Sequence, residues 1–487
     1  MMKKLTILLA TLLLLGCSNG KNPFGPGGGG DDIPAGPLID DVEITAIDLY
    51  QAVKVRLMED GQELTEHPVP IVSNRDATMR IFVQRDADFS PRNVYARVDF
   101  EDTALGPIQE EFSIDGDSTE SDLYSTLNLE IPAEHLEGTV AIQVSLRETS
   151  GDGGGSDSGA KWPASGFSSL ATESNGEALQ IVLVPVRYNA DGSGRLPDTS
   201  DTQLGLYEEM MFTFYPVTGV DMILHEPMDW NSSVSAFGGG WVNLLNAITQ
   251  LRSTDGAPAN HYYYGAFNPA DSFGQFCPAG CVLGMSNLAM NPGDSWARAS
   301  IGLGFPGDYA VSTMVHEVGH AHGREHAPCG LGGQPSDPGY PHAGASIGEW
   351  GMDIENNVLK NPDSFTDFMS YCDPAWVSDY TFDGLFDRVA AVNAMADVEP
   401  SPAAGRWLSI SLDLDGLVEL GPELDLLLTP EGEETTVELI DMDGAVAEEV
   451  PGVWRPFSDL PGGLVLFPEP DADIVAVRLP GYPSVAL

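Results

Sequence analysis

The chain has 487 residues, 42% of them hydrophobic and 8% aromatic, which is the composition of a globular protein long enough for about three domains. Its 22 basic and 73 acidic side chains give a formal net charge of −51 at pH 7. So acidic a chain lacks the basic surface that neutralises phosphates, which argues against nucleic acid as a partner.

The first residues have the pattern of a secretory signal. Lys3 and Lys4 precede an apolar run over residues 5–15, which is shorter than the about 20 residues that span a bilayer. The sequence Leu-Leu-Gly-Cys at 14–17 resembles the lipobox of bacterial lipoproteins. That resemblance implies cleavage before Cys17, a lipid on Cys17, and attachment to a bacterial membrane, at the outer membrane or cell surface. An ordinary signal peptide with a chance cysteine is the alternative.

The residues up to 174 are predicted to form a tether, a β domain and a linker. Residues 18–37 are rich in Gly and Pro, as in flexible tethers. Residues 38–149 contain short segments with apolar side chains at every second position, which predict an antiparallel β-sandwich. The clearest segments are residues 79–83, 94–98 and 140–144. A Gly-rich stretch then predicts a linker over residues 150–174.

Strands alternate with helices between residues 175 and 400. Residues 181–186 and 220–224 predict buried strands, and the segment Thr199-Ser200-Asp201 can cap a helix. The apolar stripes of two helices are Leu204, Tyr207, Met211 and Phe214, and Trp241, Leu244, Leu245, Ile248 and Leu251. This alternation predicts an α/β (α+β) domain with a mixed, mostly parallel sheet. Residues 401–487 return to β alternation and predict a small C-terminal β domain.

Residues 316–326 contain the pattern HExxHxxGxxH. A helix advances about 100° per residue, so His316 and His320 lie on one face and can bind the same metal ion. His322 points away from this face, and we expect it to pack in the core or behind the ligands. The stretch therefore predicts a metal site built on a helix.

The remaining residues of this pattern suit a catalytic site. Glu317 can take the proton of a water molecule at the metal without binding the ion. Gly323 can adopt the left-handed conformation that ends the helix, so that the chain turns and His326 supplies a third ligand. Three histidines leave a fourth position open for water or substrate, which favours catalytic Zn²⁺. A structural zinc site is the alternative.

The extended motif resembles that of the metzincin clan of zinc metallopeptidases. The resemblance covers about residues 175–398 and implies a catalytic domain with a mixed sheet and an active-site helix. It assigns Met369, in Asp-Phe-Met-Ser-Tyr at 367–371, to a Met-turn below the metal. It also implies that Tyr371 stabilises the oxyanion, as in astacin-like, serralysin-like and pappalysin-like branches. A buried aromatic that only holds the turn is the alternative for Tyr371.

The branch of the clan stays open. Ala327 and Pro328 follow the third histidine, where several branches have an acidic or small polar residue. Residues 350–353 are faintly similar to secreted glycoprotein-cleaving members. Residues 299–304 are a candidate for the edge strand that pairs with substrate in such enzymes, with an interior strand as the alternative.

Four cysteines remain if Cys17 carries lipid, and an even number outside the cytoplasm predicts two disulfides. Of the three possible pairings we favour Cys277–Cys281, across a short loop, with Cys329–Cys372. The second bond would join the segment after the third histidine to the Met-turn. A four-cysteine zinc site is the alternative, although the spacing lacks paired CxxC elements.

These features predict a lipid-anchored zinc endopeptidase outside the cytoplasm that cleaves proteins or glycoproteins. It would hold one catalytic Zn²⁺ on His316, His320 and His326, with Glu317 as the base. Acidic stretches at 413–416 and 441–444 are expected to be strand-end turns, with Ca²⁺ binding as the alternative. The rival function is a surface adhesin or binding lipoprotein that retains the metzincin scaffold.

Overall fold

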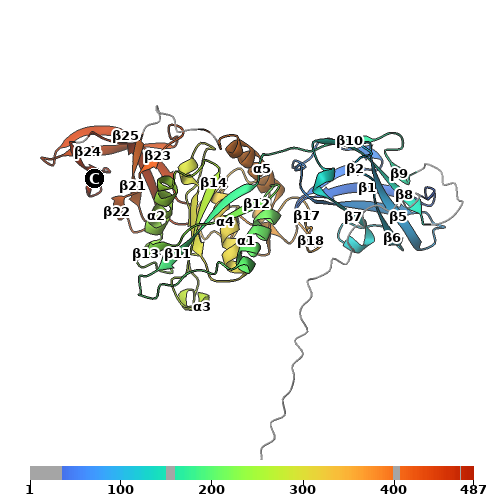
Figure 1. Cartoon of the computed structure of the whole chain (residues 1–487), viewed down its shortest axis with the longest axis horizontal. Coiled ribbons are helices and arrows are strands. Elements are labelled where there is room, and N and C mark those ends of the chain that lie inside the picture. Colours follow the sequence, from blue (N-terminus) through green and yellow to red (C-terminus); the bar gives the residue numbers. More distant parts are fainter. Residues whose placement is uncertain (1–35, 150–158, 397, 399–405, 472) are drawn as a thin grey trace, which may run out of the picture.

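The computed structural model describes residues 36–149, 159–396, 398, 406–471 and 473–487. The predicted signal peptide, Cys17 and nearly all of the predicted tether lie outside these residues. Figure 1 shows three parts in a row: a blue N-terminal β unit, a central unit with most of the helices, and an orange C-terminal β unit at the far end. The central unit carries the HExxH motif and contacts both neighbours.

The N-terminal unit consists of two antiparallel sheets that share one core, as predicted. In β5 every second residue, from Val94 to Phe100, is buried, because successive side chains of a strand point to opposite faces. The first sheet is β3 (Gln62–Glu63), β2 (Lys54–Glu59), β1 (Val42–Tyr50), β4 (Ala77–Arg85) and β7 (Leu127–Ile131). The second is β10 (Ser168–Ala171), β8 (Thr139–Glu148), β5 (Arg92–Phe100) and β6 (Ile108–Ile114), with β9 (Lys161–Trp162) beside β8.

The predicted linker at 150–174 is too long. Strands β9 and β10 lie within it, and both pair with β8. Their surroundings are rich in Ser and Gly, so the short apolar alternation at Ser168–Ala171 gives only a weak local signal.

The central unit is built on a six-stranded mixed sheet. β11 (Leu179–Tyr188) is parallel to β12 (Val220–Leu224), β13 (Met228–Trp230) and β14 (His261–Phe267). β16 (Ala299–Leu303) is parallel to β14 and antiparallel to β15 (Gly284–Ser286), which ends the sheet. The interior alternative for residues 299–304 is therefore the correct one, since β16 is paired on both sides and completely buried. The edge strand is β15.

Helices cover both faces of this sheet. α1 (Asp201–Phe214) and α4 (Asp308–Ala321) share a core with Ile181 and Leu183 of β11, whereas α2 (Trp241–Thr254) shares one with Val182 and Val184. α1 begins where predicted because Ser200 Oγ accepts a hydrogen bond from the N–H of Gln203 (3.4 Å). Two further α-helices in the described residues are α3 (Phe273–Phe276), which is short, and α5 (Asp379–Asn393), which is the longest.

The segment between α4 and α5 joins the central unit to the N-terminal unit. It forms two small pairs, β17 (Gly351–Asp353) with β18 (Val358–Lys360), and β19 (Thr366–Asp367) with β20 (Ala375–Trp376). Trp376 Nε1 donates a hydrogen bond to the Ala52 carbonyl (3.0 Å). Arg75 of the N-terminal unit is also buried against the end of α1, where it donates to the carbonyls of Phe212, Tyr215 and Val217.

The C-terminal unit is one antiparallel sheet whose ends approach each other, so that it is nearly a closed barrel. Its order is β22 (Val418–Leu420), β21 (Arg406–Leu412), β26 (Gly463–Pro468), β25 (Val446–Pro456), β24 (Glu433–Asp441), β27 (Ile474–Arg478) and β28 (Val485–Ala486), with β23 (Leu424–Asp425) beside β21. Trp407, Phe457 and Leu466 share the α2 core, so the two units have a continuous apolar interface.

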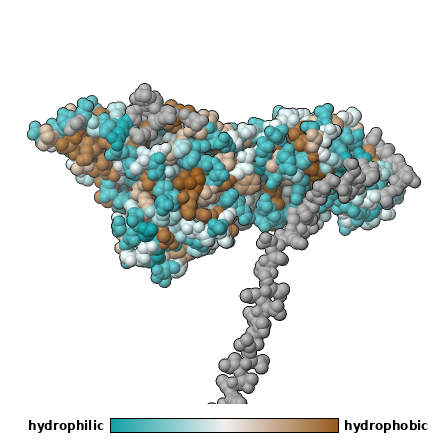
Figure 2. All heavy atoms as spheres, viewed as in Figure 1, coloured by the Kyte–Doolittle hydropathy of each residue, from teal (hydrophilic) through white to brown (hydrophobic). Residues whose placement is uncertain are grey.

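The acidic stretches at 413–416 and 441–444 are strand-end turns, as expected. Asp413 Oδ1 accepts hydrogen bonds from the backbone N–H groups of Asp415 and Leu417, and Asp441 Oδ1 accepts from Asp443 and Ala445. Figure 2 shows hydrophilic residues over most of the visible face, in keeping with the large excess of acids. No helix in the described ranges combines the length and the apolar composition that a membrane span needs.

Candidate metal centre

Helix α4 places the first two predicted ligands. Its apolar side buries Val311, Met314, Val315 and Val318 against the sheet and α1, which fixes the rotation of the helix about its axis. His316 and His320 therefore project from one side, and their Nε2 atoms lie 3.1 Å apart. The helix pattern in the sequence predicted this arrangement.

The end of α4 brings in the third histidine. The Gly323 N–H donates to the His320 carbonyl (2.7 Å) and the Arg324 N–H to the Gly319 carbonyl (3.0 Å), which is a Schellman motif. Gly323 has φ +81°, and a Cβ there would lie 2.3 Å from the Ala289 carbonyl oxygen. The chain turns at this glycine as predicted, and His326 Nε2 comes within 3.2 Å of His320 Nε2.

Two of the imidazoles, those of His316 and His320, present unprotonated Nε2 atoms to one point. His316 Nδ1 lies 2.8 Å from the Phe368 carbonyl, and His320 Nδ1 lies 2.6 Å from the Arg324 carbonyl. A carbonyl only accepts, so each Nδ1 carries the proton and each Nε2 has a free lone pair. Lone pairs that face one another at this distance are stabilised by a cation between them. The donor set therefore fits a bound metal ion.

A fourth side chain completes the cluster, and it comes from the C-terminal unit. Asp459 Oδ1 lies 3.2 Å from His326 Nε2, 3.7 Å from His316 Nε2 and 3.9 Å from His320 Nε2. Ligand atoms about 2.0–2.1 Å from a tetrahedral ion lie about 3.3 Å from one another, which is near these values. We call His316, His320, His326 and Asp459 the metal centre. The prediction of an open fourth position is wrong, because a carboxylate oxygen fills it.

Sequence reasoning missed Asp459. It follows His326 by 133 positions, in the loop between β25 and β26, and no motif marks it among the 73 acidic residues. Only the packing of the C-terminal sheet against α2 brings this loop to α4. Burial by itself would raise the pKa of Asp459, but the adjacent imidazoles of His316 and His326 lower that pKa well below its usual value.

Glu317 lies beside the metal centre without joining it. Its side chain is buried, and its Oε2 atom has no hydrogen-bond partner among the described residues. Burial, and then the negative charge of Asp459, raise the pKa of Glu317 well above its usual value. A Cβ on Gly284 of the edge strand β15 would lie 2.4 Å from Glu317 Oε1, so the strand's backbone passes directly over this carboxyl group. Such an orphaned buried oxygen suits a water molecule as its partner.

Met369 packs against α4, one residue after the carbonyl group that holds His316. It is buried, and a Cβ on Gly319 of α4 would lie 2.5 Å from its Sδ. Asp367 holds the turn, since its carboxylate accepts hydrogen bonds from the N–H groups of Met369 (2.8 Å) and Ser378 (3.0 Å). The turn also orients a ligand, because the Phe368 carbonyl is the acceptor for His316.

Tyr371 reaches the metal centre through Asp459. Its hydroxyl donates a hydrogen bond to Asp459 Oδ1 (2.7 Å), and its ring packs against His326 with centroids 4.8 Å apart. Burial, and then the charge of Asp459, raise the pKa of Tyr371, so the phenol stays a hydrogen-bond donor. The hydroxyl is therefore close enough to the metal centre to donate to an oxyanion there.

The structure confirms both favoured cysteine pairs. Cys277 is bonded to Cys281, and Cys329 to Cys372. The second bond is reinforced by two backbone hydrogen bonds, from Ala327 N–H to the Met369 carbonyl and from Tyr371 N–H to the Cys329 carbonyl (both 3.0 Å). The segment after His326 and the Met-turn are thus tied together.

His322 lies behind α4, away from the metal centre, as expected. Its ring is stacked on Tyr262 with centroids 4.0 Å apart, and its Nδ1–H donates to the Val318 carbonyl (2.8 Å). The residue is therefore part of the core.

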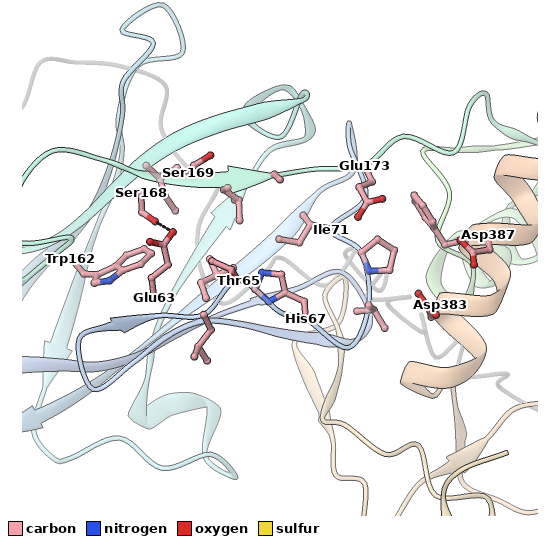
Figure 3. A pocket seen from close by; sticks show the side chains of 18 residues that line it. Glu63, Thr65, His67, Ile71, Trp162, Ser168, Ser169, Glu173, Asp383 and Asp387 are labelled. Carbon is pink, nitrogen blue, oxygen red and sulfur yellow. Dashed lines mark hydrogen bonds between the residues drawn. The ribbon is translucent and has the colours of Figure 1, made fainter. Parts of the chain in front are cut away.

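A cleft of about 610 Å³ opens beside His316 and Glu317. Its walls include Phe214, Phe368 and Val315, and the exposed rings of Phe237 and Tyr309 flank it. A separate cavity of about 560 Å³ lies between the N-terminal unit and α5, where Glu63, His67 and Asp383 are among its lining residues (Figure 3). Of these two cavities, only the first reaches the metal centre.

Comparisons with known proteins give no family. No protein-family model matches the chain, and no curated protein matches it. One similar solved structure, titled "Structure of a chaperone-substrate complex", is 14% identical, with a TM-score of 0.23. The similarity covers 56% of this chain and 38% of that chain. A likeness this small indicates nothing about function, so the interpretation rests on the geometry of the metal centre.

Proposed function

We propose that this chain is a zinc-dependent endopeptidase of the metzincin type. The observation that carries the proposal is the convergence of three histidine Nε2 atoms beside a buried glutamate with an unpartnered oxygen, at the side of an apolar cleft. Imidazole and carboxylate ligands at tetrahedral spacing suit Zn²⁺. The metzincin pattern in the sequence adds the family context.

Each residue has a definite role in peptide hydrolysis. A bound zinc ion supplies Lewis acidity that favours the attack of water on a peptide carbonyl. Glu317 takes a proton from the attacking water at its unpartnered Oε2 and later delivers it to the leaving amine. The Tyr371 hydroxyl donates a hydrogen bond to the oxyanion that develops from the carbonyl oxygen. His316 and His320 hold their orientation through the carbonyl groups of Phe368 and Arg324, and the His326 ring packs against Tyr371.

We place this activity outside the cytoplasm, on a lipid anchor at Cys17. Two disulfides in one chain support an oxidising compartment. The apolar run at 5–15 and the lipobox-like sequence at 14–17 support export and anchoring. The substrates would be proteins or glycoproteins that reach the cell surface.

The test is cleavage of fluorescently labelled denatured casein by the purified chain. We expect metal analysis to find one Zn²⁺ per chain, and 1,10-phenanthroline to abolish cleavage until Zn²⁺ is restored. Glu317→Ala should retain zinc and lose cleavage by about 10²–10⁴-fold. Glu208→Ala, an exposed glutamate on α1, is the matched control and should cleave normally. Chelator-insensitive cleavage, or full activity of Glu317→Ala, would refute the mechanism.

One observation, the presence of Asp459 as a fourth ligand, favours a second function. Four protein ligands are typical of structural metal sites, so the centre could instead fix the C-terminal unit in a surface binding lipoprotein. In that case Glu317→Ala would have no functional effect, and zinc removal would detach the C-terminal unit. Limited proteolysis with and without chelator distinguishes the two, because a detached sheet would expose Trp407, Phe457 and Leu466 of the apolar interface to cleavage.

A further inference from the structure

We propose that residues 457–462, the loop between β25 and β26, are a built-in competitor of the substrate. Their backbone lies on the edge strand where an extended peptide would pair, and the Asp459 carboxylate takes the fourth ligand position of the metal centre. The inference rests on the proposed function, because it uses the same metal site and cleft. It adds that the folded chain is inactive while the loop is in place. A substrate can bind the metal only when this loop moves aside.

The backbone of the loop lies against β15. Phe457 forms an antiparallel bridge with Asn287, directly after the strand ends. Ser458 N–H donates to the Ser286 carbonyl (3.2 Å), and Ser286 N–H donates to Ser458 Oγ (3.0 Å). The outer edge of β15 at Ser286, where the strand ends, is thus occupied by another part of the chain. Edge strands with free backbone groups are the usual place for an extended peptide to add.

The carboxylate occupies the place of a reacting group. Asp459 Oδ1 lies opposite the three Nε2 atoms and accepts the hydrogen bond of Tyr371. These are the contacts expected for the carbonyl oxygen of a substrate as it becomes an oxyanion. Asp459 and Glu317 also line the same cleft. The Asp459 carboxylate therefore occupies the ligand position that a substrate oxygen would need.

The loop is held by few contacts of its own. Beyond the Ser458–Ser286 pairing, Gln334 Nε2 donates to the Asp459 carbonyl (2.9 Å), and Leu460 lies beside Gly238 in the cleft wall. Phe457 N–H donates to the Gly462 carbonyl (3.2 Å), which closes the loop on itself. The apolar core shared with α2 holds the sheet strands and Phe457 at the start of the loop, and Leu460 packs against its edge. Residues 458–462 can therefore be displaced while Phe457 and the C-terminal sheet stay docked.

The experiment measures access to the metal with a small ligand and does not depend on catalysis. The full chain, Asp459→Ala and Asp459→Asn are loaded with Co²⁺, and acetohydroxamic acid is titrated while the visible Co²⁺ absorption is recorded. Asp443→Ala, an exposed aspartate in a turn of the same sheet, is the matched control. Thermal unfolding shows that each variant is folded, and Asp459→Asn keeps the side-chain shape if the alanine variant is unstable.

We expect one Co²⁺ per chain in every protein. The dissociation constant for acetohydroxamic acid should fall by at least about tenfold in Asp459→Ala and less in Asp459→Asn. The reason is that the apparent dissociation constant equals the intrinsic one divided by the fraction of molecules whose site is open. The control should match the wild type. Equal affinity in wild type and Asp459→Ala would overturn the proposal, and so would loss of Co²⁺, which would make Asp459 a permanent structural ligand.

A parallel casein assay separates this inference from the proposed function. If both hold, the zinc form of Asp459→Ala cleaves at least about ten times faster than the wild type, for the same reason of site occupancy. Tighter hydroxamate binding without cleavage by any variant would uphold the competitor loop and refute the endopeptidase. If wild type and Asp459→Ala cleave casein at the same rate, the competitor loop is refuted and the endopeptidase is upheld.

Discussion

Gly319 lies where α4 crosses Met369, and the contact leaves no room for a side chain. The ideal Cβ would be 2.5 Å from the sulfur and 3.3 Å from the Phe368 ring. Phe368 and Met369 support the first ligand, since the Phe368 carbonyl accepts from His316. The glycine within the HExxH motif is therefore a packing requirement of the metal centre.

Gly319→Ala should lower the free energy of unfolding by about 1–3 kcal/mol, because an extra methyl in a packed core forces its neighbours apart. It should also weaken zinc binding, since His316 loses its fixed orientation. Urea unfolding and zinc titration measure the two effects. The control is Gly205→Ala on the exposed side of α1, where an added Cβ meets no atom within 4 Å. That change should stabilise the helix by about 0.5–1 kcal/mol.

The buried His322 should make stability depend on pH. Burial lowers the pKa of His322 from 6.5 to about 3. Between these values the unfolded chain binds a proton that the folded chain does not, so stability falls as the pH falls, by about 1.4 kcal/mol per pH unit. His322→Phe keeps the stacking on Tyr262 and should remove this part of the slope.

Urea unfolding of wild type and His322→Phe at pH 7 and pH 5 tests this, with chelator present throughout so that metal release does not contribute. The stability difference between the two proteins should shift by about 2 kcal/mol in favour of the variant at pH 5. A difference that is the same at both pH values would show that His322 titrates normally.

At the scale of elements, the two disulfides differ in what they restrain. Cys329–Cys372 closes 43 positions of chain and joins the loop after His326 to the Met-turn, whereas Cys277–Cys281 closes only 4. The entropy of loop closure in the unfolded chain gives about 4 kcal/mol for the longer loop and about 2 kcal/mol for the shorter one. The longer bond also fixes ligand geometry.

Replacing Cys329 and Cys372 together by Ser should therefore cost more stability than replacing Cys277 and Cys281, and only the first change should weaken zinc binding through His326. Denaturant unfolding and zinc titration of the two double variants measure this. Zinc affinity that falls equally in both would show that the Cys329–Cys372 bond does not position the third ligand.

Local signals in the sequence were sufficient for α1, α2 and the end of α4. Ser200 marks the start of α1, Gly323 marks the end of α4, and the stripe from Trp241 marks α2, because caps and helical periodicity act within a few residues. The N-terminal sandwich and the C-terminal strands were also predicted from alternation. The edge strand β15 has only three residues, Gly-Met-Ser, too few for any pattern.

Asp459 could not be predicted in this way. Its position depends on how β25 and β26 dock on α2, and no local propensity specifies the contact between two units. The same holds for Arg75, whose role at the end of α1 depends on the N-terminal sandwich. Sequence patterns thus located the ligands on α4. They did not reveal the contacts that the N-terminal and C-terminal units make with the central unit.

At the scale of the whole molecule, a buried ion pair joins the C-terminal and central units. Arg455 of β25 lies 3.2 Å from Asp294 of the central unit, and both side chains are almost fully buried. Removing one partner leaves a buried charge unpaired, so Arg455→Ala should cost about 3–5 kcal/mol. Since β25 leads into residues 457–462, the same change should loosen Asp459.

Denaturant unfolding and hydroxamate titration of the Co²⁺ form together measure this prediction. Arg478→Ala is the control, because its ion pair with Glu438 lies on the partly exposed face of the same sheet and should contribute about 0–1 kcal/mol. An Arg455→Ala protein as stable as the control would show that apolar contacts alone hold the two units together.

Asp459 lies late in the chain, so it joins the metal centre after the other residues of the site. The histidines, Glu317 and the Met-turn are all complete by the end of α5, whereas Asp459 belongs to strands that are made afterwards. A chain that is exported N-terminus first can fold in the same order, with the histidines assembled while residues 457–462 have not yet docked. Metal can enter during that interval without any loop having to open, so the order of folding would load the site first and close it last.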